Sequence, residues 1–279
     1  MSALTVIRQA GLYGRTAVRV AQRGWRESGG DPELATEQPV FVVGSPRSGT
    51  TFLAGAVGAQ PGFVDLGEVR PVKASIERWR ELPVEDAARE LRATLERVRR
   101  LAFVRDLRPV EQTPETSFVV AAVVRAYPRG TILHIVRDGR DVVCSLLEKG
   151  WLRDDRGGRD DAGLRYGGHA RSWVEPDRLD EFAAASEAQR AAWAWRSYVT
   201  AARAEPAHTL EVRYEHIAAD PGPASDELAA RLASEPAQLR EALGAVHGRS
   251  VGRWQRDLSP EQVADVEREA GALLRELGY

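Results

Sequence analysis

The chain has 279 residues, of which 43% are hydrophobic, and this length predicts one large α/β domain with a substantial core. A formal net charge of −2 gives no global sign of binding to nucleic acid or acidic surfaces, so an anion site has to be built locally. The single cysteine, Cys144, excludes an internal disulfide framework and fits a reducing cytoplasm. No apolar run approaches the ~20 residues that span a bilayer, and arginines interrupt every apolar stretch of the N-terminus, which excludes a signal-peptide pattern.

The first 38 residues are predicted to be a basic helical extension and a linker, ahead of a domain at residues 39–279. Residues 3–27 have the pattern of a basic amphipathic helix. Such a helix either docks on a membrane surface or serves in packing and self-association, and we favour the second interpretation. The polar residues 27–37 are typical of a linker into the first strand.

The segment Pro39–Leu53, PVFVVGSPRSGTTFL, predicts a buried strand, a glycine-flanked turn and a helix. In this context backbone N–H groups and a helix N-terminus cradle an anion. An ATP-type loop has a lysine where this chain has Thr50, and the loop's only cation is Arg47. The pattern therefore predicts a phosphate loop that is not suited to a magnesium nucleoside triphosphate.

Further along the chain, apolar runs and helical periodicity alternate, which predicts a P-loop-type three-layer α/β fold with a central parallel sheet flanked by helices. The predicted strands after the first are Phe63–Leu66, Pro109–Gln112, Thr131–Val136 and Thr209–Tyr214. The predicted helices include Val84–Leu101, a helix from Ser186 to about Ala204, and a final helix opened by the capping box at Ser259.

A second anion-binding segment, RDGRDVVCSLL, follows the strand Thr131–Val136. Arg137 stands at the carboxyl end of the strand, where ligands gather in open α/β sheets. Asp138 is a candidate helix cap, and Ser145 lies about two turns into the helix, so Arg137 and Ser145 can converge on one phosphate. Two phosphate sites on one sheet predict a ligand that is phosphorylated at both ends.

Together the GSPRSGTTFL and HIVRDGRDVVCSLL segments resemble the two signatures of the PAPS-dependent sulfotransferases, closest in style to bacterial and tyrosylprotein sulfotransferases. PAPS is 3′-phosphoadenosine 5′-phosphosulfate. The resemblance implies that the first loop holds the 5′ end of PAPS, that the second segment holds the 3′-phosphate, and that two later segments, VRYEHIAADP and GRSVGRWQRDLSPEQ, lie at the nucleotide. The residues implied in cofactor binding are Arg47, Ser48, Gly49, Thr50, Thr51, Arg137, Ser145, Tyr214, Arg249 and Arg253.

The same resemblance implies the catalytic roles. Glu68, in the pair Gly67-Glu68, corresponds to the general base that takes the proton of an acceptor hydroxyl, and Arg47 stabilises the transferring group and leaving phosphate. No metal is implied. Many relatives have a lysine where this chain has Gln112, so Arg70, Lys73 or another arginine has to supply that charge, or turnover is slow.

The acceptor stays open among small molecules, natural products, lipids and tyrosyl peptides. Residues 150–185 are predicted to be an acceptor-side lid or insertion, in which Tyr166, His169 and Trp173 are candidate acceptor contacts and His169 a second candidate base. The alternatives to a sulfotransferase are a P-loop nucleotide kinase or NTPase, and a nucleotide-binding relative without catalysis.

Overall fold

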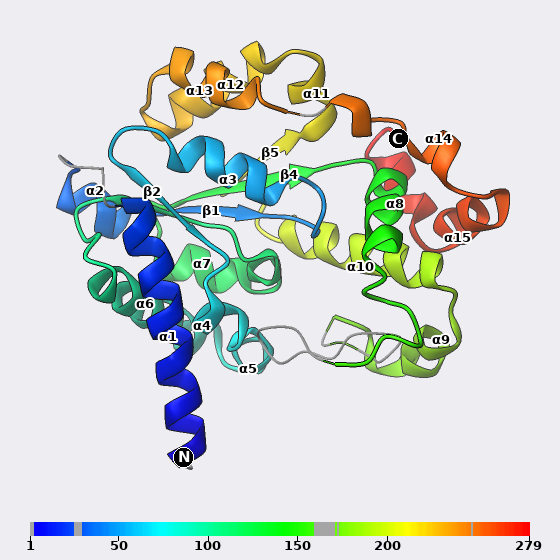
Figure 1. Cartoon of the computed structure of the whole chain (residues 1–279), viewed down its shortest axis with the longest axis horizontal. Coiled ribbons are helices and arrows are strands. Elements are labelled where there is room, and N and C mark those ends of the chain that lie inside the picture. Colours follow the sequence, from blue (N-terminus) through cyan, green and yellow to red (C-terminus); the bar gives the residue numbers. More distant parts are fainter. Residues whose placement is uncertain (1–2, 25–29, 159–170, 172, 247) are drawn as a thin grey trace.

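The structure is a computed structural model, and it describes residues 3–24, 30–158, 171, 173–246 and 248–279. Five strands form one sheet in the order β2-β3-β1-β4-β5, and each neighbouring pair is parallel (Figure 1). The strands are β1 (Val40–Val43), β2 (Phe63–Gly67), β3 (Arg108–Glu111), β4 (Thr131–Val136) and β5 (Thr209–Arg213). The predicted α/β class and central parallel sheet are therefore confirmed.

Helices cover both faces of the sheet, and the alternation of strand side chains decides which residues meet which helices. Val40 and Val42 of β1 pack in the core under one helical layer, whereas Phe41 and Val43 point into the core of the opposite layer. The first layer contains α3 (Thr50–Gly58), α11 (Tyr214–Ala219), α12 (Pro221–Leu232) and α13 (Pro236–Leu243). The second contains α6 (Val84–Leu101), α7 (Val120–Ala126) and α10 (Glu187–Ala202).

A separate core cluster lies beyond the carboxyl end of β4, among α8 (Gly139–Lys149), α10 and α15 (Pro260–Glu276). Trp193 and Trp195 of α10 are fully buried there with Leu274 of α15. Ser259 and Gln262 form the predicted capping box of α15. This cluster holds α8, and with it the second anion-binding segment, against the end of the sheet.

Short helices connect these layers on the side of β2 and in the C-terminal third. They are α4 (Arg70–Lys73), α5 (Ile76–Glu81), α9 (Leu179–Ala184), α14 (Trp254–Asp257) and the 3-10 turns Pro114–Val119, Pro176–Arg178 and Gly248–Ser250. The sequence patterns did not predict them, because helices of four to six residues have too few turns to display a period.

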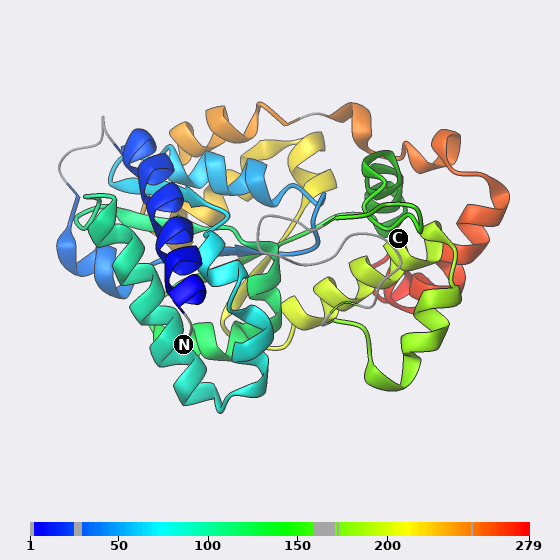
Figure 2. The same cartoon turned by 60° about the horizontal axis from the view of Figure 1, so that its bottom comes forward.

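The N-terminal extension packs against the domain. Helix α1 (Ala3–Gly24) lies along one side of the domain, beside β2, α4 and α6 (Figure 2). Its residues Leu12, Ala17 and Val20 are buried. Within the predicted linker, Pro32–Glu37 forms the short helix α2 instead. This helix forms because its N-terminus is well capped. The Asp31 side chain accepts hydrogen bonds from the N–H groups of residues 33 and 34, and a proline occupies the first turn.

Candidate active site

The loop between β1 and α3 has a backbone shape that only a few residue types allow. Gly44, Arg47 and Gly49 have positive φ angles of 140°, 73° and 103°. A side chain at Gly44 would lie 2.5 Å from the Ile135 carbonyl oxygen, and one at Gly49 would lie 2.9 Å from the Tyr214 ring. Arg47 adopts the left-handed conformation at a cost of about 1–2 kcal/mol, and this strain indicates a functional constraint on the loop.

The N-terminus of α3 is open toward this loop. Its cap residue, Gly49, supplies no side-chain hydrogen bond, so the first N–H groups of the helix and its positive dipole end are available to an anion. Thr50 is buried at the first position. Thr51 is exposed, and its hydroxyl donates to Gln112 Oε1 at 3.4 Å. Gln112 thus contacts the first turn of α3, although it brings no charge.

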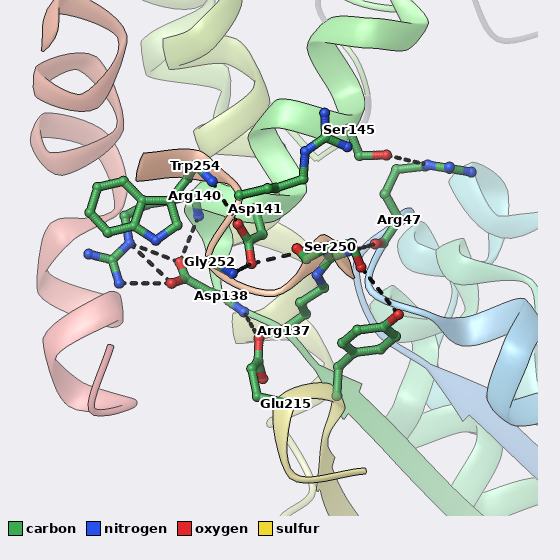
Figure 3. Close-up of polar contacts among 12 residues, drawn as sticks. Arg47, Arg137, Asp138, Arg140, Asp141, Ser145, Glu215, Ser250, Gly252 and Trp254 are labelled. Atoms are coloured by element: carbon green, nitrogen blue, oxygen red, sulfur yellow. Dashed lines mark hydrogen bonds and ion pairs between the residues drawn. The ribbon is translucent and has the colours of Figure 1, made fainter. Parts of the chain in front are cut away.

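Arg137 lies at the carboxyl end of β4 and is fixed from several sides (Figure 3). Its guanidinium donates through Nη1 to the Arg47 carbonyl at 3.3 Å and through Nη2 to the Ser250 carbonyl, and it stacks 4.8 Å from the centroid of the Tyr214 ring. Its own carbonyl accepts the indole N–H of Trp195 at 3.0 Å. These contacts hold a cation at the meeting point of the loop, β4 and the C-terminal segment.

Ser145 connects the two predicted phosphate-binding segments. Its Oγ accepts a hydrogen bond from Arg47 Nε at 2.9 Å (Figure 3). Two buried polar atoms nearby, Ser48 Oγ and Arg137 Nε, have no hydrogen-bond partner among the described residues. Because buried polar atoms in proteins are normally paired, these two indicate a place for a polar ligand.

The C-terminal segment from Gly248 to Asp257 is hydrogen-bonded to α8. Asp141, one turn after Arg137, accepts the Gly252 N–H at 2.8 Å and the Trp254 N–H at 3.0 Å. Burial raises the pKa of this carboxyl, and the two N–H groups and Arg137, at 3.8 Å, act in the opposite direction. Sequence reasoning missed Asp141. The only signal was its place in the first turn of the helix predicted after Arg137, four residues beyond that arginine.

The two arginines predicted in this segment have different surroundings. Arg253 forms ion pairs with Glu148 of α8 and, at 2.7 Å, with Asp257. These partners raise the pKa of its guanidinium. Arg249 is exposed, with no hydrogen bond or ion pair to another described residue. Arg253 therefore braces the segment against α8, whereas Arg249 stands at the surface.

Glu68 lies directly after β2, beside a cleft of about 230 Å³. Its carboxylate is 3.3 Å from Lys73 Nζ, and the same ammonium group is 3.6 Å from Glu115. Tyr198 lines the cleft as well, and burial together with the charge of Glu115 raises the pKa of its hydroxyl. The lining consists of Pro46, Glu68, Lys73, Pro114, Glu115, Leu146, Trp151, Leu152, Arg171, Trp173, Ala194 and Tyr198.

The lining residues come from parts of the chain that are distant in sequence, from the β1–α3 loop to α10. Sequence reasoning therefore found Glu68, Lys73 and Trp173 there but missed Glu115 and Tyr198. Of the other candidates in residues 150–185, Tyr166 and His169 lie outside the described residues. Within the described ranges no group of three or more His, Cys, Asp or Glu side chains is arranged to hold a metal ion. None of the helices described here is long and apolar enough to cross a bilayer.

Comparison with known proteins adds a family and a fold. A model of the sulfotransferase family matches residues 39–235, whereas no curated protein sequence matches. The chain resembles the solved sulfotransferase domain of the Synechococcus PCC 7002 olefin synthase, with a TM-score of 0.50 and 13% identity over 87% of this chain and 96% of that one. This likeness supports the α/β fold seen here.

Two further structures are similar at TM-scores just below that level. A Mycobacterium avium sulfotransferase is 16% identical over 86% of this chain and 77% of its own, with a TM-score of 0.48. A mouse sulfotransferase complexed with PAP is 15% identical over 92% of each chain, with a TM-score of 0.49.

Proposed function

Because the chain belongs to the sulfotransferase family, we propose that it transfers a sulfuryl group from PAPS to a hydroxyl group of an acceptor. In this reaction the acceptor oxygen forms a bond to sulfur while the bond from sulfur to the 5′-phosphate oxygen breaks. The acceptor proton passes to a base of the protein, and adenosine 3′,5′-bisphosphate (PAP) leaves.

The observation that carries the proposal is the hydrogen bond between Arg47 and Ser145, which brings the phosphate loop and the second anion-binding segment into one site. PAPS carries a phosphosulfate at its 5′ end and a phosphate at its 3′ end. Its binding therefore needs two clusters of hydrogen-bond donors, separated by about the width of a ribose. The unpaired Ser48 Oγ and Arg137 Nε fit this need, as do the open N–H groups at the start of α3. Tyr214 and Arg249 are the other residues proposed to contact the nucleotide. Arg253 holds the C-terminal segment, residues 248–257, against α8.

In the proposed reaction Arg47, the hydroxyls of Thr50 and Thr51 and the loop N–H groups around Gly49 stabilise the negative charge that develops on the leaving phosphate. Glu68 accepts the acceptor proton. Lys73, at 3.3 Å from Glu68, supplies a cation on the side where Gln112 has none.

The cleft beside Glu68 is the proposed acceptor site. Trp151 and Trp173 give it broad apolar walls, and the charged groups lie around Glu68 and Lys73. This composition suits a hydroxyl-bearing molecule with an apolar or aromatic body.

The test is thermal stabilisation of the protein by PAP, compared with ADP and with ATP plus Mg²⁺. A ligand at 100 times its dissociation constant adds about 2.7 kcal/mol of stability, which is readily seen as a melting shift. We expect selective stabilisation by PAP, followed by release of PAP from PAPS when hydroxyl acceptors are supplied. Equal or greater stabilisation by ATP with Mg²⁺ would instead favour a P-loop kinase or NTPase.

A further inference from the structure

Helix α1 lies outside residues 39–235, which the family model matches, yet it reaches the candidate active site. It runs beside β2 and packs against α4, the helix that follows Glu68 (Figure 1). The carboxyl end of β2 is irregular between Asp65 and Gly67 and bends at Glu68, and residues 65–68 are called the turn at Glu68 below. Two arginines of α1, Arg19 and Arg23, reach over this turn.

Arg19 contacts the backbone of the candidate base itself. Its Nη2 donates to the carbonyl oxygen of Glu68 and lies 3.4 Å from that of Leu66. Burial and the neighbouring charges of Arg23 and Arg70 lower the pKa of Arg19, whereas Glu68 and Asp65 act in the opposite direction. An arginine stays charged under such conditions, because its ordinary pKa is so high.

Arg23 fixes the start of the same turn. Its Nη1 pairs with Asp65 Oδ2 at 2.7 Å and donates to the Asp65 carbonyl at 3.1 Å, and the other carboxylate oxygen of Asp65 accepts the Gly67 N–H at 2.7 Å. Gly67 has a φ of 62°, and a side chain on it would lie 2.8 Å from Arg23 Nη1. The positive φ of Gly67 is a conformation that favours glycine, and the missing side chain leaves the Arg23 guanidinium space beside the turn.

The sheet holds the other side of the turn. The Val69 N–H donates to Thr113 Oγ1 at 2.9 Å, and Glu111 in turn accepts the Thr113 N–H at 2.8 Å. The peptide group that joins Glu68 to Val69 is therefore held at both of its polar atoms, the carbonyl by Arg19 of α1 and the N–H by Thr113 after β3. The peptide group before Glu68 is held through the Gly67 carbonyl, which accepts the Gln112 N–H at 3.4 Å. What remains for the Glu68 side chain is its own rotation, which the ion pair with Lys73 restricts.

From these contacts we infer that Arg19 is a positioning residue for Glu68, so that the N-terminal helix is a working part of the active site. The inference rests on the proposed function for its catalytic meaning. A displacement of about 1 Å at a reacting group costs up to about 100-fold in rate. Loss of the Arg19 contact is therefore expected to lower kcat while nucleotide binding, which uses β1 and β4, stays intact.

The experiment compares Arg19→Ala with Arg15→Ala in the full-length protein. Arg15 is an exposed arginine one turn earlier on the same helix, so its variant controls for the lost charge. Three quantities are measured: kcat with PAPS and para-nitrophenol, the affinity for PAP, and hydrogen exchange of the amides at residues 66–69. Arg19→Gln is measured in parallel. It keeps a hydrogen-bond donor and much of the side chain, so it takes the place of Arg19→Ala if that variant does not fold.

We expect kcat to fall about 10- to 100-fold in Arg19→Ala, with PAP affinity within about twofold of the wild type and faster exchange at residues 66–69. Arg15→Ala is expected to match the wild type in all three. The inference is overturned if Arg19→Ala shows the same exchange rates at residues 66–69 as Arg15→Ala. It is also overturned if exchange in Arg19→Ala is faster but its kcat is unchanged.

Failure of the proposed function can be distinguished from failure of the inference about Arg19. A wild-type protein that neither binds PAP nor releases it from PAPS contradicts the sulfotransferase proposal, while the exchange measurement still decides whether Arg19 holds the turn at Glu68. A loss of PAP affinity in Arg19→Ala equal to the loss in kcat would mean a general structural role, and it also overturns positioning.

Discussion

The two halves of the sheet's carboxyl edge are built in different ways. At β1 and β4 the polar groups come from two short segments, each a strand followed directly by a turn and a helix, and the two segments meet through Arg47 and Ser145. At β2 and β3 the surroundings of Glu68 come from α1, α4, the 3-10 turn Pro114–Val119 and α10.

This difference fits the roles proposed for the two halves. A phosphate is bound by backbone N–H groups and one or two cations, and a strand–turn–helix unit supplies these within about a dozen residues. A base has to be held in one direction beside a cleft of particular shape, which takes supports from several elements. Substitutions in the two halves are therefore expected to act on different quantities, turnover at β2 and PAP affinity at β1 and β4.

Substitution of Glu68 tests the β2 half alone. Glu68→Gln keeps the size of the side chain but cannot accept a proton, so kcat is expected to fall about 10²- to 10⁴-fold. Affinity for PAP is expected to stay at the wild-type value, and Glu77→Gln, an exposed glutamate on α5, serves as the control. Steady-state kinetics and PAP titration measure both quantities. Sulfation at the wild-type rate by Glu68→Gln would remove Glu68 as the base.

Substitution of Arg137 tests the β1–β4 half. The guanidinium is buried and stacked on Tyr214, and hydrogen bonds to charged groups contribute about 1.5–3 kcal/mol each. We therefore expect Arg137→Ala to weaken PAP binding about 10- to 100-fold in calorimetric titration. The matched control is Arg129→Ala, an exposed arginine at the opposite, amino end of β4. Equal losses in the two variants would contradict a phosphate site at Arg137.

Asp141 tests whether the C-terminal segment belongs to the nucleotide half. Asp141→Asn keeps one acceptor oxygen for the N–H groups of Gly252 and Trp254, which leaves one N–H unpaired. Loosening of this segment is expected to lower PAP affinity about 10-fold, because the hydrogen bond of a partly buried N–H group to a charged carboxylate is lost, at about 1.5–3 kcal/mol. The kcat at saturating PAPS is expected to be unchanged. Asp180→Asn, at an exposed site on α9, is the control, and an unaltered affinity in Asp141→Asn would separate the segment from the site.

The sequence predicted the β1–β4 half better than the β2 half, for a physical reason. The run from Val40 to Thr51 contains both the buried strand and the turn glycines, so its local conformation follows from local residues. The same holds for the segment from Thr131 to Ser145, and the structure brings Arg47, Arg137 and Ser145 together.

By contrast, nothing in the residues around Glu68 indicates that Arg19 lies against its carbonyl or that Tyr198 lines its cleft. Those contacts depend on how whole helices pack, and α1 is placed by apolar residues such as Val20 that any amphipathic helix has. The short helices α4 and α5, which carry Lys73 and shape the cleft, have no periodic signal either.

The last expected effect is on stability rather than on turnover or PAP affinity, and it comes from Glu111, which lies beneath the β2 half. Burial raises the pKa of this carboxyl to about 7, against 4.5 ordinarily. Between these values the folded protein binds more protons than the unfolded chain, so the stability from this group is complete below pH 4.5 and is lost as the pH rises through 7, by at most about 3 kcal/mol. Glu111→Gln resembles the protonated form and can still pair with Thr113 and Thr116.

Urea unfolding of the wild type and Glu111→Gln from pH 5 to pH 8 measures this effect. We expect similar stability at pH 5 and a growing advantage of the variant toward pH 8. Glu111 accepts the Thr113 N–H, and Thr113 Oγ1 accepts the Val69 N–H. Ionisation of Glu111 is therefore expected to affect the peptide group between Glu68 and Val69, whose carbonyl Arg19 contacts. Parallel stability curves for the two proteins would show that Glu111 is ionised in the folded state, and the support of Glu68 from β3 would then rest on a buried charge rather than on a neutral carboxyl.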